Sequence, residues 1–245
     1  MRHATHMLRA GSAAIAATAL SLTTAMSSSQ PAATRSVTAT ERAGASACPN
    51  IDMVYRDRSA FPNTPKGRRA YGMQSVTIEH AVVCLVNAAR KAPLKRPVAL
   101  RGAPLGLGGA AHRHVQDAVR LRWWGTVEEI KNCIPSAQDP NRCDTHINPQ
   151  NKSTPQSRVT DAGYVRRCGK WGVGENTYTG WGARNVTPRA AFNAWMESKG
   201  HRDNILNPEF RETRVGVAWG SADPDAGSVT PALSYVQVFG FCNSP

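Results

Sequence analysis

Histidines and carboxylates are the side chains of this sequence best suited to metal or acid–base chemistry. There are seven histidines, and neutral imidazoles and carboxylates are the usual protein ligands of zinc-like ions. Glu197 and His201 are four residues apart, so they share one face if a helix extends that far. His112 and His114 are two apart and face different ways on a helix, so we expect both at the surface. No Ser-His-Asp, Cys-His or His-Glu-x-x-His pattern accompanies them.

Six cysteines carry the second kind of chemistry. An even number of cysteines in an exported chain predicts disulfides, and the absence of a Cys-x-x-Cys pair argues against a zinc knuckle. Sequence alone leaves the connectivity open. The pairs we predict are Cys48–Cys84, Cys133–Cys143 and Cys168–Cys242. The second has the most support, because it closes a short loop.

Residues 1–33 have the layout of a secretory signal peptide. Arg2 and Arg9 give a basic start without any acidic residue, and an Ala/Leu/Ile-rich run over residues 13–26 leads to small residues at 32 and 33. The alternative is a disordered N-terminal tail. No other segment approaches the roughly 20 apolar residues of a transmembrane helix. We therefore predict a secreted, extracellular protein without a membrane span.

The remaining chain divides into an arm and one domain. Residues 34–74 include a Ser/Ala/Thr/Arg stretch with few large apolar side chains, which predicts a flexible N-terminal arm or linker. Residues 75–245 carry the elements of the domain. The predicted helices are 75–92, 107–121 and a third that runs from Thr187-Pro188 to about Gly200, and the predicted strands are 171–178, 214–219 and 233–241. Between them, residues 123–160 are polar and predict a long irregular loop pinned by a disulfide.

Charge limits the class of partner. The formal net charge is +13, and +11 remains if Arg2 and Arg9 leave with the signal. Such a surface associates with acidic polymers or anionic lipid headgroups. The basic residues are scattered, and no helix-turn-helix, zinc-finger or RNP-like pattern is present. We expect non-specific electrostatic attraction and no sequence-specific nucleic-acid partner.

Several motifs together resemble those of a known family. The run Trp195–Leu206 (Trp-Met-Glu-Ser-Lys-Gly-His-Arg-Asp-Asn-Ile-Leu) is similar to the signature of bacterial CAP domains, also called SCP domains. These are relatives of cysteine-rich secretory proteins, insect venom antigens and plant pathogenesis-related proteins. Gly174-Glu175-Asn176 resembles the family's Gly-Glu-Asn strand motif, and Arg158 matches the approach to it. The resemblance covers about residues 78–242 and implies an α+β fold, a three-layer α-β-α sandwich with a central antiparallel sheet and long loops, stabilised by disulfides.

The resemblance also implies a site, because many members share a cleft with two histidines and one or two glutamates that can bind a divalent metal. By position, Glu175 is the glutamate of Gly-Glu-Asn and His201 is the histidine of Gly-His-Arg. His146 takes the place of the first histidine, although the Cys133–Cys143 loop sets it farther from its helix than is usual. Glu197 adjoins the position of the family's second glutamate. The expected cleft therefore comprises these four residues, with His146, His201 and Glu175 as ligands of a zinc-like ion.

Three functions stay open on these grounds. The first is an extracellular binding or interaction module, not an enzyme, acting as a monomer on a metal, a lipid, a cell-wall component or an anionic polymer. The second is a secreted metal-dependent hydrolase of the nuclease or phosphoesterase kind. The third is a structural domain with a vestigial cleft, in which Glu175 and His201 only anchor loops. We favour the first, because the motifs come without a catalytic signature and a fold does not fix a function.

Overall fold

The computed structural model describes residues 48–91, 101–102 and 105–245. The predicted signal at residues 1–33, and residues 34–47 of the predicted arm, lie outside the described residues. The helices are α2 (Pro65–Lys91), α3 (Leu105–Leu121), α4 (Pro155–Asp161), α5 (Pro188–Glu197) and α6 (Lys199–Leu206), with short 3-10 turns η1 (Arg58–Ala60), η2 (Ala183–Asn185) and η3 (Pro224–Ala226). The strands are β1 (Arg101–Gly102), β2 (Lys170–Trp181), β3 (Glu212–Trp219) and β4 (Ala232–Asn243).

The strands form one sheet in the order β1-β3-β4-β2. β4 lies between β2 and β3 and is antiparallel to both, and the short β1 adds to β3 in parallel. Glu175 on β2 pairs with Val238 on β4. The first nine residues of β4 are all buried. This is the pattern of a central strand that is covered on both faces.

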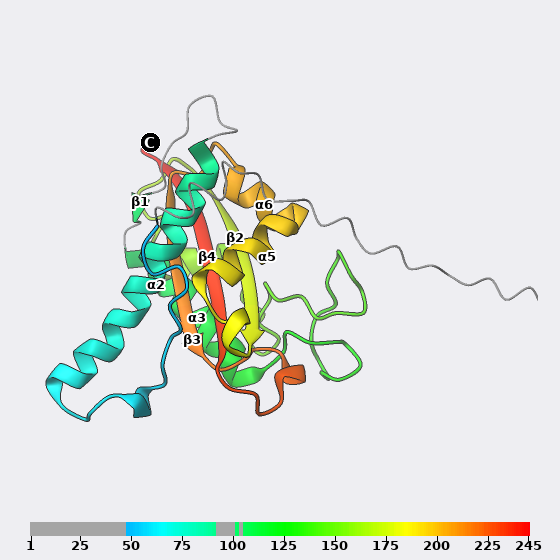
Figure 1. The fold of residues 1–245 in the computed structure, drawn as a ribbon. Coiled ribbons are helices and arrows are strands. Elements are labelled where there is room, and N and C mark those ends of the chain that lie inside the picture. The colour runs from blue at the N-terminus through cyan, green and yellow to red at the C-terminus, as the bar shows by residue number, and fades with distance from the viewer. Residues whose placement is uncertain (1–47, 92–100, 103–104) are drawn as a thin grey trace, which may run out of the picture. The chain divides into compact units, whose positions relative to one another are not determined.

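Helices cover the two faces of the sheet, which gives the expected α-β-α sandwich (Figure 1). On one face, α2, α5 and α6 pack against Leu233, Tyr235 and Phe239 of β4. On the other, α3 packs against Val236 and Val238. Alternate residues of a strand point to opposite faces, so this one strand serves both cores. The α+β class, the antiparallel pairing and the three-layer arrangement are confirmed.

All three predicted disulfides are present. Cys48–Cys84 ties the segment before α2 to that helix, where Ile51 is buried against Ala81 and Leu85. Cys168–Cys242 joins the start of β2 to the end of β4. Cys133–Cys143 lies within the loop between α3 and α4. Each bridge fixes a segment that has little regular structure of its own.

Two helices differ from the prediction. α2 begins at Pro65 instead of residue 75, because Thr64 and Pro65 supply the cap and the first helical residue. The predicted third helix is two helices, since Ser198 is extended between α5 and α6. The condition under which Glu197 and His201 would share a helix face, one helix through both residues, is therefore not met. Arg202 donates to the Met196 carbonyl at this break and satisfies a terminal α5 acceptor.

The loop between α3 and α4 is irregular, as expected, until Thr154 starts α4. Thr154 and Ser157 form a capping box, and Pro155 is the first helical residue.

No helix in the described part of the chain is long and apolar enough to span a membrane.

Candidate functional site

The site is built around the carboxylate of Glu175, which points from β2 into the protein. The residue is only 5% exposed. Arg158 Nη2 donates to both carboxylate oxygens at 2.9 and 2.8 Å. His146 Nδ1 is 3.0 Å from Oε1, and His114 Nε2 is 3.5 Å from the same oxygen. We call these four residues the glutamate cluster.

Arg158 reaches the carboxylate from α4. Its second terminal nitrogen, Nη1, donates to the carbonyls of His146 at 3.1 Å and Ser153 at 2.9 Å. The guanidinium is buried together with its partner. One arginine therefore neutralises Glu175 and also holds the loop that carries His146. The sequence motif had singled out Arg158 without indicating this role.

His114 joins the cluster from α3, so the prediction that it is a surface residue was wrong. It is 1% exposed, and its Nε2–H donates to the Thr145 carbonyl at 2.9 Å. Its Nδ1 has no partner in the described part of the chain. His114 follows Leu107 by seven residues and Ala111 by three, which is the spacing of the buried α3 stripe. That periodicity was the signal for its burial. His112 is only partly exposed.

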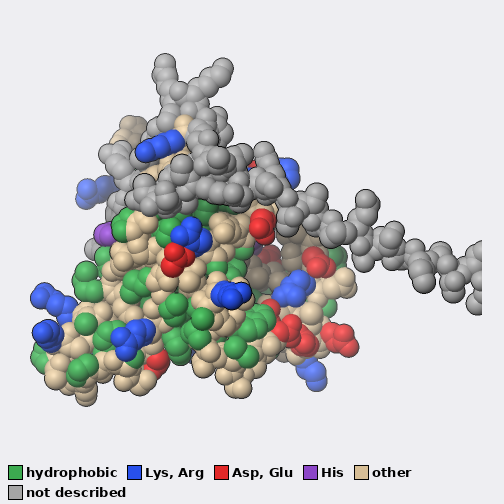
Figure 2. Space-filling view, viewed as in Figure 1, with side chains coloured by type: hydrophobic (Ala, Val, Ile, Leu, Met, Phe, Trp, Pro, Cys, Tyr) green, Lys and Arg blue, Asp and Glu red, His purple; other side chains and the backbone are tan. Residues whose placement is uncertain are grey.

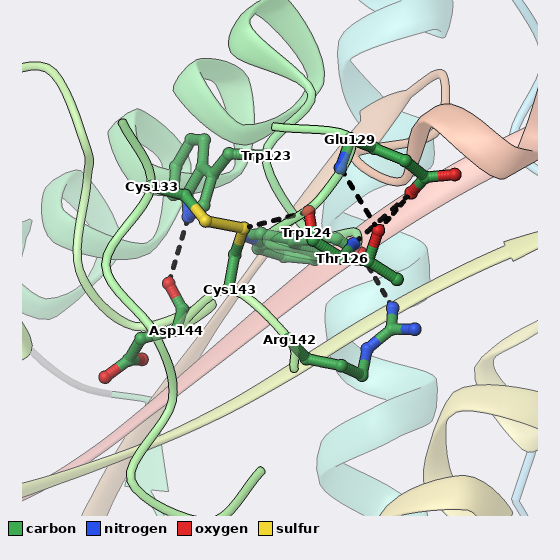
Figure 3. Close-up of a disulfide and its surroundings, with 8 residues drawn as sticks. All are labelled: Trp123, Trp124, Thr126, Glu129, Cys133, Arg142, Cys143 and Asp144. Atoms are coloured by element: carbon green, nitrogen blue, oxygen red, sulfur yellow. Dashed lines mark hydrogen bonds between the residues drawn. A yellow bond between two sulfur atoms is a disulfide. The ribbon is translucent and has the colours of Figure 1, made fainter. Parts of the chain in front are cut away.

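His146 is positioned by the disulfide-pinned loop, whose bridge and neighbouring tryptophans are drawn in Figure 3. Its backbone N–H donates to Asp144 Oδ1 at 2.8 Å, and the indole N–H of Trp123 donates to the Asp144 carbonyl at 3.1 Å. The Cys133–Cys143 bridge lies beside the rings of Trp123 and Trp124. The insertion that separates His146 from its helix is thus a packed support, and the imidazole stays 34% exposed.

His201 lies on α6 and faces His146. Their ring centroids are 6.4 Å apart with an interplanar angle of 65°, and we call them the histidine pair. Two asparagines hold α6 to β2. Asn176 Nδ2 donates to the His201 carbonyl, and Asn204 Nδ2 donates to the Glu175 carbonyl and to Asn176 Oδ1. The backbone of His201 is therefore tied to the strand that carries Glu175.

Glu197 is not brought to this site. It is exposed at the end of α5 and lines a groove of about 500 Å³ with Asp52, Tyr178 and Arg189 among others. The structure thus assembles His146, Glu175 and His201 from the expected residues and adds His114 and Arg158.

The charges of the site follow from burial and from its ion pairs. Burial disfavours an ionised Glu175, but His114, Arg158 and the hydrogen bond from His146 lower its pKa to about 2. Burial also lowers the pKa of His114, whereas Arg158 supplies a permanent positive charge. Burial would lower the pKa of His146, yet Glu175 raises it. Burial and the neighbouring His146 lower the pKa of His201 to about 4.

These contacts decide what each group can do chemically. Both oxygens of the Glu175 carboxylate accept from Arg158, and within the described residues no three His, Cys, Asp or Glu side chains are arranged to hold a metal ion. In its neutral form His146 donates from Nδ1 to Glu175, which leaves Nε2 as its acceptor. A carboxylate that orients an imidazole through its other nitrogen is the usual support of a metal-bound histidine. His201 is neutral at physiological pH, as a ligand must be.

Comparison with known proteins finds a family model that matches part of this chain. Residues 133–239 match the sequence model of CAP, the cysteine-rich secretory protein family. A 47-residue stretch is 47% identical to the uncharacterized protein YkwD of Bacillus subtilis (strain 168), covering 19% of this chain and 16% of that protein.

Two solved structures are also similar. An extracellular protein containing an SCP domain from Bacillus anthracis str. Ames is 20% identical, over 73% of this chain and 44% of its own, with a TM-score of 0.44. An outer surface protein of Borrelia burgdorferi is 17% identical, over 66% of this chain and 90% of its own, with a TM-score of 0.37. The chain spans less than half the length of YkwD and of the Bacillus anthracis protein.

Proposed function

Because this chain belongs to the CAP superfamily of cysteine-rich secretory proteins, we propose that it is an extracellular binding module, and that it binds a divalent cation through the histidine pair. In this proposal His146 and His201 are the ligands. Glu175, which the family resemblance offered as a third ligand, orients His146 instead. Solvent completes the coordination of a zinc-like ion.

The engagement of both Glu175 carboxylate oxygens by Arg158 carries this proposal. Turning it toward a metal would separate it from Arg158 and leave a buried guanidinium without its anion. Breaking a buried pair in this way costs about 3–5 kcal/mol. His146 needs no such rearrangement, because its Nδ1 is already bonded to Glu175 and the ring is partly exposed.

The same observation argues against the hydrolase alternative. A metal-dependent hydrolase needs a positioned general base in addition to its metal ligands. Glu175 is ionised but bound on both oxygens, and Glu197 lines a different groove. The vestigial alternative, in which the histidine pair binds nothing, is separated from the proposal by experiment.

Zinc titration of the purified chain by calorimetry tests the proposal. We expect one zinc ion per chain, and binding lost in both His146→Ala and His201→Ala. His80→Ala is the matched control, since His80 is an exposed histidine on α2, and it should bind like the unmodified chain. If zinc does not bind, or binds equally well in both pair variants, the proposal is wrong. Hydrolysis of a model phosphodiester that disappears in these variants would favour the enzyme.

A further inference from the structure

A second feature, independent of the histidine pair, is a cluster of basic side chains around the start of α2. Within residues 56–69 the only acidic residue is Asp57, and its Oδ1 accepts from the Ser59 N–H at 2.8 Å. The members of this basic cluster are Arg56, Arg58, Lys66, Arg68 and Arg69. None of the five forms an ion pair with any carboxylate of the described residues.

Two of these guanidinium groups converge on one neutral atom. Asn63 Oδ1 accepts from Arg58 Nη2 at 3.2 Å and from Arg68 Nη1 at 3.3 Å. Like charges brought together at a shared acceptor repel each other. Elsewhere on the surface the protein pairs such groups with acid, as where Arg189 meets Asp52. The convergence is therefore a local arrangement and does not simply reflect the basic composition.

Aromatic rings hold two of the four arginines in place. The Arg56 guanidinium lies 5.3 Å from the centre of the Phe61 ring, and that of Arg58 lies 5.9 Å from the centre of Tyr71. Phe61 and Tyr71 pack edge to face. Cation–π contacts orient a guanidinium without cancelling its charge. The donors are thus ordered while their positive charge stays available.

The helix itself adds to the positive potential. The first turn of α2 contains no acidic residue, although acidic side chains are the ones that stabilise this end of a helix. Lys66 and Arg68 lie in this turn instead and Arg69 follows it, and all three are exposed. Figure 2 shows blue side chains gathered at the end of the molecule where α2 begins. A bound anion would relieve this repulsion.

We propose that the basic cluster is a binding surface for a polymer of repeating phosphate groups. Four of its five members are arginines, whose planar fork matches two oxygens of one phosphate. Their spread over an extended segment and a helix suits a chain of anions better than a single one. A membrane surface is a poorer fit. Membrane-binding helices offer Trp, Phe or Leu to the lipid. Here Phe61 and Tyr71 lie against guanidiniums, and the only large apolar side chains exposed on α2 are Met73 and Val76.

Binding of inorganic polyphosphate to the full chain, measured by calorimetry at several salt concentrations, tests this proposal. The variant Arg58→Gln/Arg68→Gln/Arg69→Gln should bind polyphosphate at least about tenfold more weakly. The slope of its log association constant against log salt concentration should be smaller in magnitude by roughly 2–3. The matched control Arg166→Gln/Arg167→Gln/Lys170→Gln removes the same charge from another exposed segment. It should change the affinity by no more than about twofold.

Equal weakening in the two triple variants would overturn the proposal, since diffuse charge would then explain binding. Binding to phosphatidylglycerol vesicles without binding to polyphosphate would overturn it in favour of a membrane. Thermal melts establish that the variants fold. If the triple variant of the basic cluster does not fold, Arg58→Lys/Arg68→Lys tests the proposal instead. It keeps both positive charges but loses the paired N–H donors of the guanidinium groups. A several-fold loss of affinity with an unchanged salt dependence supports the proposal, and unchanged affinity refutes it.

Discussion

Replacing Arg158 with leucine should strongly destabilise the fold, because it leaves the Glu175 carboxylate buried without its cation. Both side chains are nearly inaccessible, and Arg158 Nη2 contacts both carboxylate oxygens at 2.9 and 2.8 Å. Removing one partner of a buried ion pair costs about 3–5 kcal/mol. The lowered pKa of Glu175 reflects the whole glutamate cluster, because His114 is the largest cause of the lowering, ahead of Arg158 and His146. A decrease from 4.5 to about 2 corresponds to about 3 kcal/mol of folding free energy.

The pH dependence of this effect has a definite sign. In the unmodified chain the folded-state pKa of Glu175 lies below its ordinary value, so its stabilisation is complete above pH 4.5 and is lost as the pH falls toward 2. In Arg158→Leu the pKa of Glu175 should rise, because one of the groups that offset its burial is gone. Protonation then relieves the buried charge, so the destabilisation should be smaller at pH 5 than at pH 7.

Urea unfolding at both pH values, followed by tryptophan fluorescence with the disulfides intact, measures these differences. Arg189→Leu is the matched control. Its pairing with Asp52 also engages both carboxylate oxygens, from Nε and Nη2 at 2.7 and 2.8 Å, but the side chains are 42% and 64% exposed. We therefore expect a loss below about 1 kcal/mol. If Arg158→Leu loses no more free energy of unfolding than Arg189→Leu, burial does not determine how much the Arg158–Glu175 ion pair contributes to stability. Adding Glu175→Leu should recover part of the loss.

Two further predictions concern the histidine pair and its supporting loop. The folded-state pKa of His201 is about 4, so the chain should lose stability as the pH falls from 6.5 toward 4. In His201→Gln the thermal midpoint should depend less on pH across that window. An unchanged pH dependence of the midpoint would contradict the lowered pKa of His201. Cys133→Ser/Cys143→Ser should lower the free energy of unfolding by about 2–3 kcal/mol and weaken zinc binding, because Asp144 and His146 follow the bridge directly. Undiminished zinc affinity in that variant would show that the loop does not position His146.

The sequence predicted most of the secondary structure and the disulfides of this protein, because both depend on local patterns. The apolar run of β4, the apolar stripe of α3 and the spacing of the cysteines all have direct physical signals in the sequence. Glu175 and His201 were recognisable because they lie in short motifs. The break at Ser198 was not predicted, since it depends on how α6 is anchored to β2 through Asn204.

The glutamate cluster was only partly predictable, because its contacts join four distant segments. Nothing near Arg158 in the sequence indicates that it meets Glu175, and α4 itself is a short capped helix within a polar stretch. His114 was assigned to the surface from a two-residue spacing, although its register with Leu107 placed it in the core. A polar residue in a buried stripe is the kind of position where polarity and periodicity disagree, and here periodicity was the better guide.

One carboxylate thus fixes the relative positions of a strand, a helix, a short capped helix and a disulfide-pinned loop. Burying an ion pair seldom adds net stability compared with apolar packing, but it penalises every arrangement in which the pair is broken. Misplacing α4 or the His146 loop would leave Glu175 or Arg158 buried without a partner. The cluster therefore selects one geometry for His146, while the asparagines of β2 and α6 hold His201 opposite. This arrangement is what a binding site made of two imidazoles requires, because two ligands bind a cation well only when their positions are fixed in advance.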